Sequence, residues 1–298
     1  MSIPLHDPKL LKTQYKSRGG ALIRGEATYF LKSLKDESVD LVFADPPYNL
    51  AKERWDEFGS NQEYMFWSSW WIKEAFRVLK PNGAMYLCGF SETLADLKPL
   101  AMKYFKGCKW LVWFYRNKAN LRNDWGRSHE SILHLRKDDE FTFNLDQVRV
   151  PYNRHTTNYP ERQQAATSQY NKYGVGRKNH QSWEPNPFGA RPRDVLEIPV
   201  VGGSGSESTK HPAQKPVLLM RKIILASTHV GELVVDPFSG SGTTLVAAKQ
   251  LKRKWLGCDI NREYNKIAIS RLEKVLDKPI EDWIKLDFSL QRRRVKFS

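Results

Sequence analysis

The feature of this sequence that most constrains its fold is an alternation of short apolar runs with segments of helical periodicity. Such short apolar runs predict strands buried on both faces, and strands that alternate with helices predict a parallel sheet covered by helices. In the first stretch the expected strands are Ser38–Ala44, Ala84–Phe90, Trp110–Arg116 and Ser131–Lys137, with a helix at Tyr64–Leu79 and a turn at Pro81–Gly83. In the second stretch the expected strands are Glu232–Phe238 and Lys254–Ile260, and the helices are Val217–Thr228, Leu245–Leu251 and Glu263–Leu276. The sequence therefore predicts an α/β fold with a doubly wound, mostly parallel sheet.

Between these two stretches the periodicity fades. Over residues 138–207 Pro, Gly, Asn, Gln and Arg dominate, which is typical of an irregular insert. We therefore expect a core formed by residues 20–137 and 208–275, with the insert at 138–207. Residues 1–19 are then an N-terminal arm, and residues 276–298 a basic C-terminal tail.

The net charge of +15 over 298 residues favours a polyanionic partner, above all DNA. The basic residues gather in two stretches, Lys103–Arg127 and Arg149–Arg193, and in the second they alternate with aromatic residues such as Tyr152 and Phe188. This mixture suits contacts with phosphates and bases. No apolar stretch approaches the ~18 residues of a membrane span, and the N-terminus has no signal-peptide pattern. We expect no membrane contact and a cytoplasmic protein.

Cysteines and histidines give no indication of a metal site. The three cysteines, Cys88, Cys108 and Cys258, are scattered without metal-ligand spacing, and the histidines form no set. Reduced thiols in a cytoplasmic protein are the expected state of the cysteines. The sequence therefore predicts no metal.

A glycine-rich turn follows the expected strand that ends at Asp236. The segment Asp236–Thr244 reads DPFSGSGTT, and its glycines let the backbone turn tightly and approach a ligand. It lacks the third glycine of a dinucleotide motif and the Lys-Ser/Thr end of a P-loop. Asp259 ends the next expected strand, where an acid can accept hydrogen bonds from a ribose diol. The pair predicts a site for an adenosine-containing cofactor.

A second acid, Asp45, stands at the end of an earlier strand and is followed by Pro46, Pro47 and Tyr48. Ligands of open parallel sheets bind beyond the carboxyl ends of the strands. Proline has no N–H and a fixed φ, so the Pro46 carbonyl can be held outward beside the Asp45 carboxylate. Two fixed acceptors suit an exocyclic amine, whose nitrogen becomes nucleophilic as it moves toward tetrahedral geometry. Tyr48 can stack on a base that has rotated out of the duplex.

Three segments in this order, DPPYNL at Asp45–Leu50, HPAQKP at His211–Pro216 and DPFSGSGTT at Asp236–Thr244, resemble the β class of amino-group DNA methyltransferases. The resemblance covers residues 20–137 and 208–275. It implies a circularly permuted fold of the S-adenosylmethionine-dependent methyltransferase type, with target recognition in the middle insert.

The resemblance also implies roles for individual residues. Asp45, Pro46, Pro47 and Tyr48 would bind and activate the target base, and His129-Glu130 matches a segment that lines the target pocket or serves a structural role. The residues it assigns to S-adenosylmethionine are Asp236, Phe238, Ser239, Gly240, Ser241, Gly242, Thr243 and Asp259, with Gln214 and Lys215 at the methionine end and Glu26 near the adenine.

Together these features predict a site-specific DNA methyltransferase that modifies the N6 amine of adenine after base flipping. DPPY in place of SPPY favours adenine within this family. Three alternatives stay open: methylation of cytosine N4, action on single-stranded DNA, and a nucleic-acid-binding protein with a vestigial methyltransferase fold. A homodimer and a cognate restriction endonuclease that shares the recognition site stay open as further partners.

Overall fold

A computed structural model describes residues 11–49, 58–119, 123, 125–158, 162–163, 182–183, 185–202 and 207–295. The chain divides into two compact units, which are described separately: the first comprises Met1–Asn144 and Arg193–Ile280, the second Leu145–Pro192 and Glu281–Ser298. In the described part of the chain, no helix combines the length and apolarity that a membrane span requires.

A nine-stranded mixed sheet forms the centre of the first unit, in the order β1-β2-β11-β10-β3-β4-β6-β5-β9. Its strands are β1 (Lys12–Ser17), β2 (Gly20–Arg24), β3 (Val39–Ala44), β4 (Leu79–Gly89), β5 (Gly107–Ala119), β6 (Arg127–Arg136), β9 (Val195–Glu197), β10 (Leu233–Asp236) and β11 (Lys254–Asp259). Strands β2, β11, β10, β3 and β4 run parallel, whereas β1 pairs antiparallel with β2, and β6 antiparallel with both β4 and β5. The predicted α/β fold with a mostly parallel sheet is confirmed.

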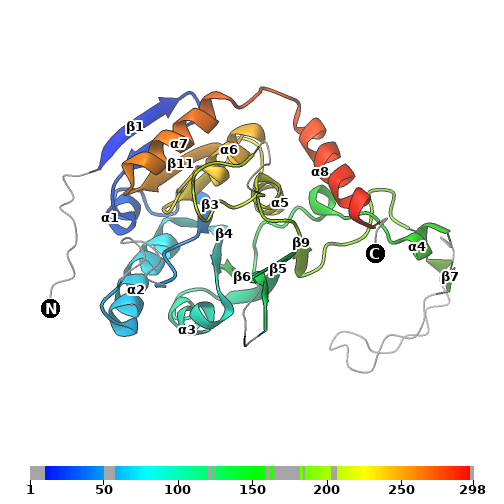
Figure 1. The fold of residues 1–298 in the computed structure, drawn as a ribbon, viewed down its shortest axis with the longest axis horizontal. Helices are drawn as coiled ribbons and strands as arrows, with labels where there is room; N and C mark the ends of the chain where they lie inside the picture. The colour runs from blue at the N-terminus through cyan, green and yellow to red at the C-terminus, as the bar shows by residue number, and fades with distance from the viewer. Residues whose placement is uncertain are drawn as a thin grey trace. The chain divides into compact units, whose positions relative to one another are not determined.

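Helices cover the sheet in two groups (Figure 1). The helices are α1 (Ala27–Lys32), α2 (Asn61–Val78) and α3 (Ser91–Ala101) in one group, and α5 (Val217–Ser227), α6 (Thr243–Gln250) and α7 (Arg262–Glu273) in the other. Within each group neighbouring helices pack against each other, α1 on α2 on α3 and α5 on α6 on α7. This is the doubly wound arrangement expected from the alternation of strands and helices.

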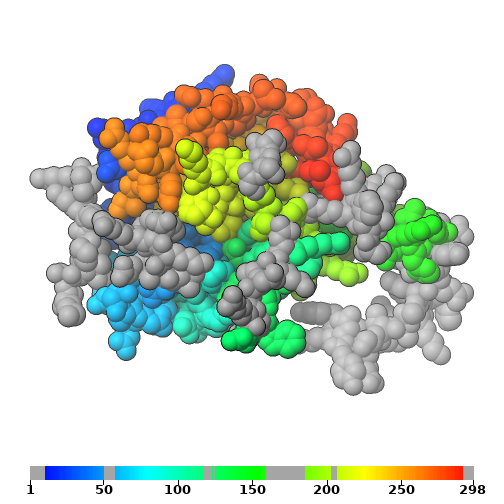
Figure 2. Space-filling view, in the orientation of Figure 1, coloured from blue at the N-terminus to red at the C-terminus, as the bar shows by residue number. Residues whose placement is uncertain are grey.

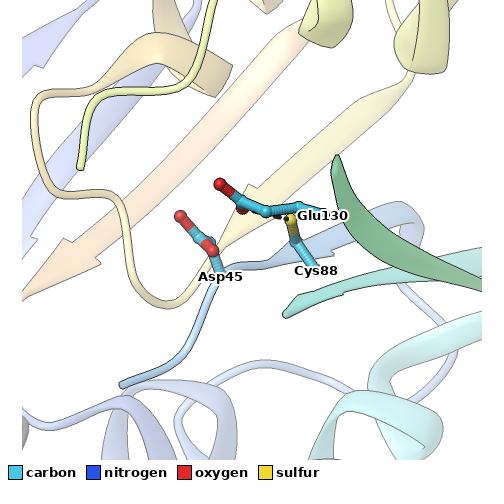
Figure 3. A group of neighbouring side chains, drawn as sticks. All are labelled: Asp45, Cys88 and Glu130. Atoms are coloured by element: carbon cyan, nitrogen blue, oxygen red, sulfur yellow. Dashed lines mark hydrogen bonds between the residues drawn. The ribbon is translucent and has the colours of Figure 1, made fainter. Parts of the chain in front are cut away.

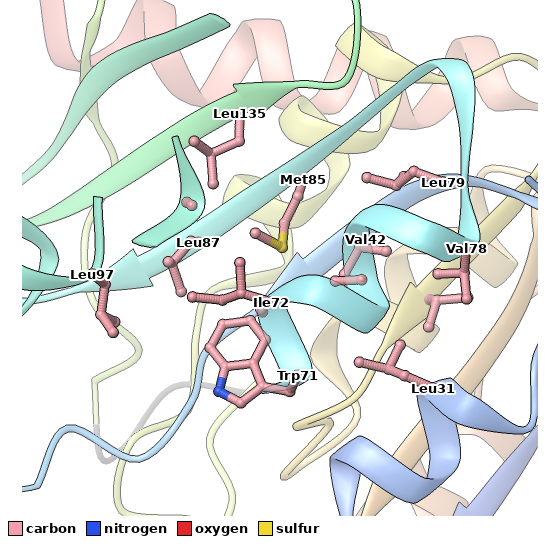
Figure 4. Packing of buried hydrophobic residues seen from close by; sticks show 14 of the residues in the cluster. Leu31, Val42, Trp71, Ile72, Val78, Leu79, Met85, Leu87, Leu97 and Leu135 are labelled. Atoms are coloured by element: carbon pink, nitrogen blue, oxygen red, sulfur yellow. The ribbon is translucent and has the colours of Figure 1, made fainter. Parts of the chain in front are cut away.

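The core lies between α2 and strands β3 and β4 (Figure 4). Trp71 and Ile72 of α2 are fully buried there with Val42 of β3 and Met85 of β4. The helical periodicity correctly places a buried face on this helix; its buried indoles are those of Trp67 and Trp71, while Trp70 is only half-buried. The same face of α2 contacts Phe238 of the glycine-rich turn.

Two local expectations are corrected. Pro81–Gly83 is not a turn: these residues lie inside β4, where the pairing shifts from Val39–Leu79 to Leu41–Ala84. Between these two pairs, the four residues 80–83 of β4 stand opposite the single residue Asp40 of β3, and the strand accommodates the extra residues as a bulge. The expected arm at 1–19 contains edge strand β1, whose Tyr15 ring stacks on Trp255 of β11.

The second unit combines part of the middle insert with the end of the chain. It contains the short helix α4 (Arg154–Asn158), the 3-10 turn η3 (Leu145–Val148), the strand pair β7 (Arg162–Gln163) and β8 (Ser182–Trp183), and most of α8 (Ile280–Val295). An isolated bridge pairs Val150 with Ala190, and the Arg149 guanidinium donates to Asp146 and to the Gly189 carbonyl. The expected tail at 276–298 thus contributes a helix, and the expected phosphate contact of Arg149 stays a prediction.

Candidate functional site

The carboxyl end of β3 carries Asp45, which makes two short contacts. One carboxylate oxygen lies 2.7 Å from Nζ of Lys215, and the other accepts a hydrogen bond of 2.6 Å from the Tyr48 hydroxyl. Asp45 is only 17% exposed, and Lys215 is 7% exposed. The acid therefore faces the interior of the site, as expected of a ligand-binding acid beyond a parallel strand.

Glu130 joins this cluster from β6 (Figure 3). Its Oε2 accepts from the Tyr48 hydroxyl at 3.1 Å and lies 3.3 Å from Nζ of Lys215. Cys88, near the end of β4, donates its S–H to the same oxygen at 3.6 Å. Because β6 runs antiparallel to β4, its first residues lie at the edge of the sheet where β3 and β4 end. The sequence resemblance left Glu130 between a pocket role and a structural role; the structure places its carboxylate beside Asp45.

Lys215 is the cation of this cluster. Burial opposes its charge, but the carboxylates of Asp45 and Glu130 raise the pKa of Lys215 well above its usual value. The resemblance assigns Lys215 to the methionine end of a cofactor, whereas its ammonium group is paired with the acid of the other motif. Periodicity and spacing could not have revealed this pairing, since the partners are 170 residues apart in the sequence.

The atoms of Asp45, Cys88 and Glu130 that could ligate a metal all lie within 4.8 Å of one another. Lys215 already presents a positive charge to both carboxylates. Burial, together with both carboxylates, raises the pKa of the Cys88 thiol well above its usual value, although Lys215 opposes that shift. The thiol therefore stays protonated, and a protonated thiol is a poor metal ligand. Charge balance in the cluster is consequently provided by an ammonium group.

Tyr48 points its hydroxyl into the cluster. Burial, followed by the nearby Asp45 carboxylate, raises the pKa of the Tyr48 phenol well above its usual value, so the hydroxyl remains a donor. The Tyr48 and Phe90 rings pack edge-to-face, with 4.9 Å between their centroids. The Arg127 guanidinium lies over the Phe90 ring, 3.7 Å from its centroid. The expected stacking of Tyr48 on a base stays a prediction; in this conformation its hydroxyl is engaged by the acids.

The prolines fix the backbone between Asp45 and Tyr48. The Pro47 carbonyl accepts a hydrogen bond of 2.8 Å from the Tyr64 hydroxyl of α2. Asn49 has φ +57°, and its side chain accepts from the Phe58 amide at 3.2 Å. The turn is therefore attached to α2, which holds the acid in place. The expected role of the Pro46 carbonyl as an acceptor stays a prediction.

The glycine-rich turn has the backbone conformation that its sequence predicts. Gly240 has φ +47° and Gly242 has φ +75°, in the left-handed region that favours glycine. A Cβ on Gly240 would lie 2.7 Å from the His211 ring, and one on Gly242 would lie 2.7 Å from Cβ of Ala268. Glycine is thus required at both positions by conformation and by close packing.

A buried acid, Asp236, and a half-buried acid, Asp259, flank this turn. Asp259, at the end of β11, accepts from the backbone amides of Gly240 and Asn261, each at 2.8 Å, and Asp236 accepts from the Phe238 amide at 3.0 Å. Burial raises the pKa of Asp236 to about 7 and that of Asp259 to about 6. The carboxyl oxygens of both acids accept hydrogen bonds from neutral backbone amides. Oxygens in such surroundings can also accept from the hydroxyl groups of a ligand.

Further side chains hold the turn. Phe238 packs edge-to-face on Trp71 at 5.2 Å between centroids and against Trp67, so it is anchored in the core. Arg271 of α7 donates to the Ser241 carbonyl at 2.9 Å and to the Thr243 hydroxyl at 2.8 Å. No sequence pattern indicated a role for Arg271, because it lies 28 residues beyond Thr243 on an amphipathic helix.

The HPAQKP segment connects the two ends of the site. His211 packs on Gly240 and, at 4.2 Å between ring centroids, on Tyr264, while Lys215 pairs with Asp45. Gln214 accepts from the Thr209 hydroxyl and donates to the Glu207 carbonyl, so it stabilises the segment itself. Figure 2 shows this segment in yellow-green on the visible face, next to the orange of α7. The expected contact of Gln214 with a cofactor stays a prediction.

Glu26 lies at the start of α1, where it acts as the N-cap. Its carboxylate accepts from the amides of Thr28 and Tyr29, at 2.8 Å and 3.1 Å, and from the Trp67 indole at 3.1 Å. The acid at this position therefore stabilises the helix end. A contact with the adenine of a cofactor stays a prediction.

The basic stretches are only partly described. In the first, Lys106, Lys109, Arg116 and Arg127 each pair with an acid. Trp125, just before β6, is 93% exposed. About half of the second stretch, including Tyr159, Tyr170, Tyr173, Arg177 and Lys178, falls outside the described residues, so its predicted role in base readout stays a prediction.

A family profile described as DNA methylase, of the N6/N4 methyltransferase type, matches residues 39–270. The type II methyltransferase M.HpaI of Haemophilus parainfluenzae is 33% identical over 259 residues, which are 85% of this chain and 74% of that protein. The DNA adenine methyltransferase YhdJ of Escherichia coli (strain K12) is 34% identical over 271 residues, which are 88% of this chain and 85% of that protein.

Solved structures agree in fold. The cytosine-N4-specific PvuII DNA methyltransferase superposes with a TM-score of 0.66 at 19% identity, covering 97% of this chain and 96% of that one. The M1.HpyAVI–SAM complex gives a TM-score of 0.55 at 23% identity, covering 85% of this chain and 98% of that one. At these identities the likeness concerns the fold alone.

Proposed function

Because this chain belongs to the DNA methylase family of the N6/N4 type, we propose that it methylates the N6 amine of adenine at specific sites in DNA after base flipping. The DPPY segment and the similarity to the adenine methyltransferase of Escherichia coli support adenine. The observation that carries the proposal is the HPAQKP segment, which packs against Gly240 at one end and is paired with Asp45 at the other. One segment thereby contacts both Asp45, which is proposed to bind the target nucleobase, and the glycine-rich turn, which is proposed to bind the cofactor.

S-adenosylmethionine is the methyl donor of the family, and when bound it supplies an electrophilic methyl group on a sulfonium sulfur. The residues around the glycine-rich turn fit it. The buried Ser239 hydroxyl has no hydrogen-bond partner among the described residues, and Asp259 offers a carboxylate beside Gly240. In the proposal, Asp259 accepts hydrogen bonds from the ribose hydroxyls of the cofactor. The backbone of Gly240 and Gly242 lies close to the rest of the cofactor.

At the other end, Asp45 accepts hydrogen bonds from the target amine. Its backbone is held by α2 through the Pro47 carbonyl, so the acceptor is in place before the substrate arrives. Acceptors that grip the amine hydrogens favour the tetrahedral nitrogen of the transition state over the planar ground state. The Tyr48 ring then stacks on the flipped base, after its hydroxyl has left the acids.

DNA is the substrate of this family, and the basic stretches of this chain are proposed to neutralise its phosphates. A cytoplasmic location, a homodimer and a cognate restriction endonuclease belong to the proposal as well. DNA affinity should fall steeply with salt, because phosphate neutralisation releases counterions.

The test is chemical identification of the product. DNA incubated with the pure protein and radiolabelled S-adenosylmethionine is digested to nucleosides and separated. Label in N6-methyldeoxyadenosine supports the proposal, whereas label in N4-methyldeoxycytidine overturns the adenine assignment. A protein that binds DNA but neither binds S-adenosylmethionine nor transfers label would be a vestigial methyltransferase. Comparing duplex with single-stranded DNA in the same assay determines the strandedness of the substrate.

A further inference from the structure

The Tyr48 hydroxyl marks a position at which one donor reaches two carboxylates. Its oxygen lies 2.6 Å from Oδ1 of Asp45 and 3.1 Å from Oε2 of Glu130. A hydroxyl has a single hydrogen to offer to these two acceptors, whereas an exocyclic amine has two. The phenol oxygen also accepts from Nζ of Lys215 at 3.3 Å, so the position combines two acceptors with one donor, and an amine placed there can satisfy both acceptors at once.

We infer that this position is the site of the target amine and that Glu130 is a further catalytic residue, the second acceptor of the amine and the base that takes its proton. The inference rests on the proposed function, since it concerns the same amine. It also assigns Tyr48 two successive places: its hydroxyl between the acids in the empty site, and its ring against the base once the amine has displaced the hydroxyl.

The charges of the cluster support a base at this position. Two carboxylates and the Lys215 ammonium leave one net negative charge next to the amine, which becomes positively charged during attack. Without the ammonium, two neighbouring carboxylates would tend to share one proton. Lys215 pairs with both acids, and the negative charge that remains stabilises the developing positive charge on nitrogen.

The other acceptors are less suited to take the proton. A backbone carbonyl such as that of Pro46 can orient an N–H but is a very weak base. Asp45 is held more closely by Lys215, at 2.7 Å against 3.3 Å for Glu130. The Cys88 thiol acts as a donor in the cluster, toward Glu130. Glu130 is therefore the carboxylate that the ammonium holds less closely, and in the proposal it takes the proton.

The step balances as follows. The lone pair of the amine nitrogen forms the new bond to the methyl carbon, and the carbon–sulfur bond breaks with its electron pair remaining on sulfur. The nitrogen then carries a positive charge and both of its hydrogens. One proton passes to Glu130, which returns a neutral methylated amine and leaves a carboxylic acid that releases the proton to water.

The test compares Glu130→Gln with the wild type in single-turnover methylation. The amide keeps the size and one acceptor oxygen but cannot take a proton. We expect the rate to fall by ~10²–10⁴-fold, the usual contribution of a general base. Base flipping, followed by 2-aminopurine fluorescence at the target position of a mapped recognition site, should change less than about threefold, as should S-adenosylmethionine binding by calorimetry.

Controls separate a chemical role from a structural one. Glu37→Gln removes an exposed acid that pairs with Lys137, away from the cluster, and should leave the rate unchanged. If Glu130→Gln fails to fold, Glu130→Asp keeps a carboxylate and should retain more activity than Glu130→Ala. A rate for folded Glu130→Gln within about fivefold of wild type overturns the inference.

The wild-type measurement distinguishes the two proposals. Label on cytosine overturns the adenine assignment, while the comparison with Glu130→Gln still applies because both bases present an exocyclic amine. A wild-type protein that transfers no label overturns the proposed function and the role of Glu130 with it. Normal transfer to adenine by both proteins overturns the role of Glu130 alone.

Discussion

The two ends of the site hold their acids in opposite ways. At the end of β3, Asp45 and Glu130 share the buried ammonium of Lys215. At the ends of β10 and β11, Asp236 and Asp259 accept from backbone amides, and burial raises their pKa values to about 7 and about 6. In the proposed reaction the first arrangement places two carboxylates beside the target amine, whereas the second offers acceptors for the hydroxyls of the cofactor.

Removing Asp45 should have the largest effect, because it eliminates the acceptor at the charged end. Asp45→Ala should lower the single-turnover rate by about 10³-fold or more, at the upper end of the range measured for a single stabilising group. Binding of S-adenosylmethionine and DNA should remain largely intact, as calorimetry and a filter-binding assay can determine. Near-normal turnover would refute the role assigned to this acid.

Replacing Lys215 tests whether its ammonium group stabilises the cluster at the end of β3. Lys215→Met leaves Asp45 and Glu130 without a counter-charge, and loss of one partner of a buried pair typically costs about 3–5 kcal/mol in the free energy of unfolding. Denaturant unfolding measures this loss. Lys266→Met is the matched control: it removes an exposed i,i+3 pair with Glu263 on α7, which should cost less than about 1 kcal/mol. Equal losses in the two variants would contradict the buried role of Lys215.

Asp236, at the end of β10, should make the stability of the protein depend on pH. The pKa of Asp236 is raised to about 7 from 3.8, so the folded protein binds this proton more tightly than the unfolded chain. Stability is therefore fully present below pH 3.8 and is lost as pH rises toward about 7. Asp236→Asn does not titrate, so its free energy of unfolding relative to wild type should rise by up to about 4 kcal/mol between pH 3.5 and 8. A pH-independent difference would mean that Asp236 has the same pKa in the folded protein as in the unfolded chain.

Asp259 should give the smallest effect. Asp259→Ala should weaken S-adenosylmethionine binding by ~1–3 kcal/mol, the scale of hydrogen bonds that involve a charged group. In the wild type, affinity should increase as pH rises through about 6, because the ionised carboxylate is the better acceptor. Calorimetry at pH 5 and pH 7.5 measures both effects. Unchanged affinity in the variant would argue against the ribose contact.

Local sequence patterns determined the strands and helices of the core and the glycine conformations of the turn. Apolar runs and 3.6-residue periodicity depend on near neighbours in the chain, which is why β3, α2, β10 and α6 could be predicted. Asp45 and Asp259 could be recognised as well, because each follows directly from the end of a strand.

Tertiary structure alone decided which of these groups meet. Glu130 reaches Asp45 because β6 pairs antiparallel with β4, and Lys215 reaches both acids because its segment spans the ends of two parallel strands. The bulge at Pro81–Gly83, edge strand β1 and the contacts of Arg271 likewise depend on partners distant in the sequence. The sequence by itself thus determined where the chemical groups could be found, while the order of the strands decided which charges lie close enough to act on one another.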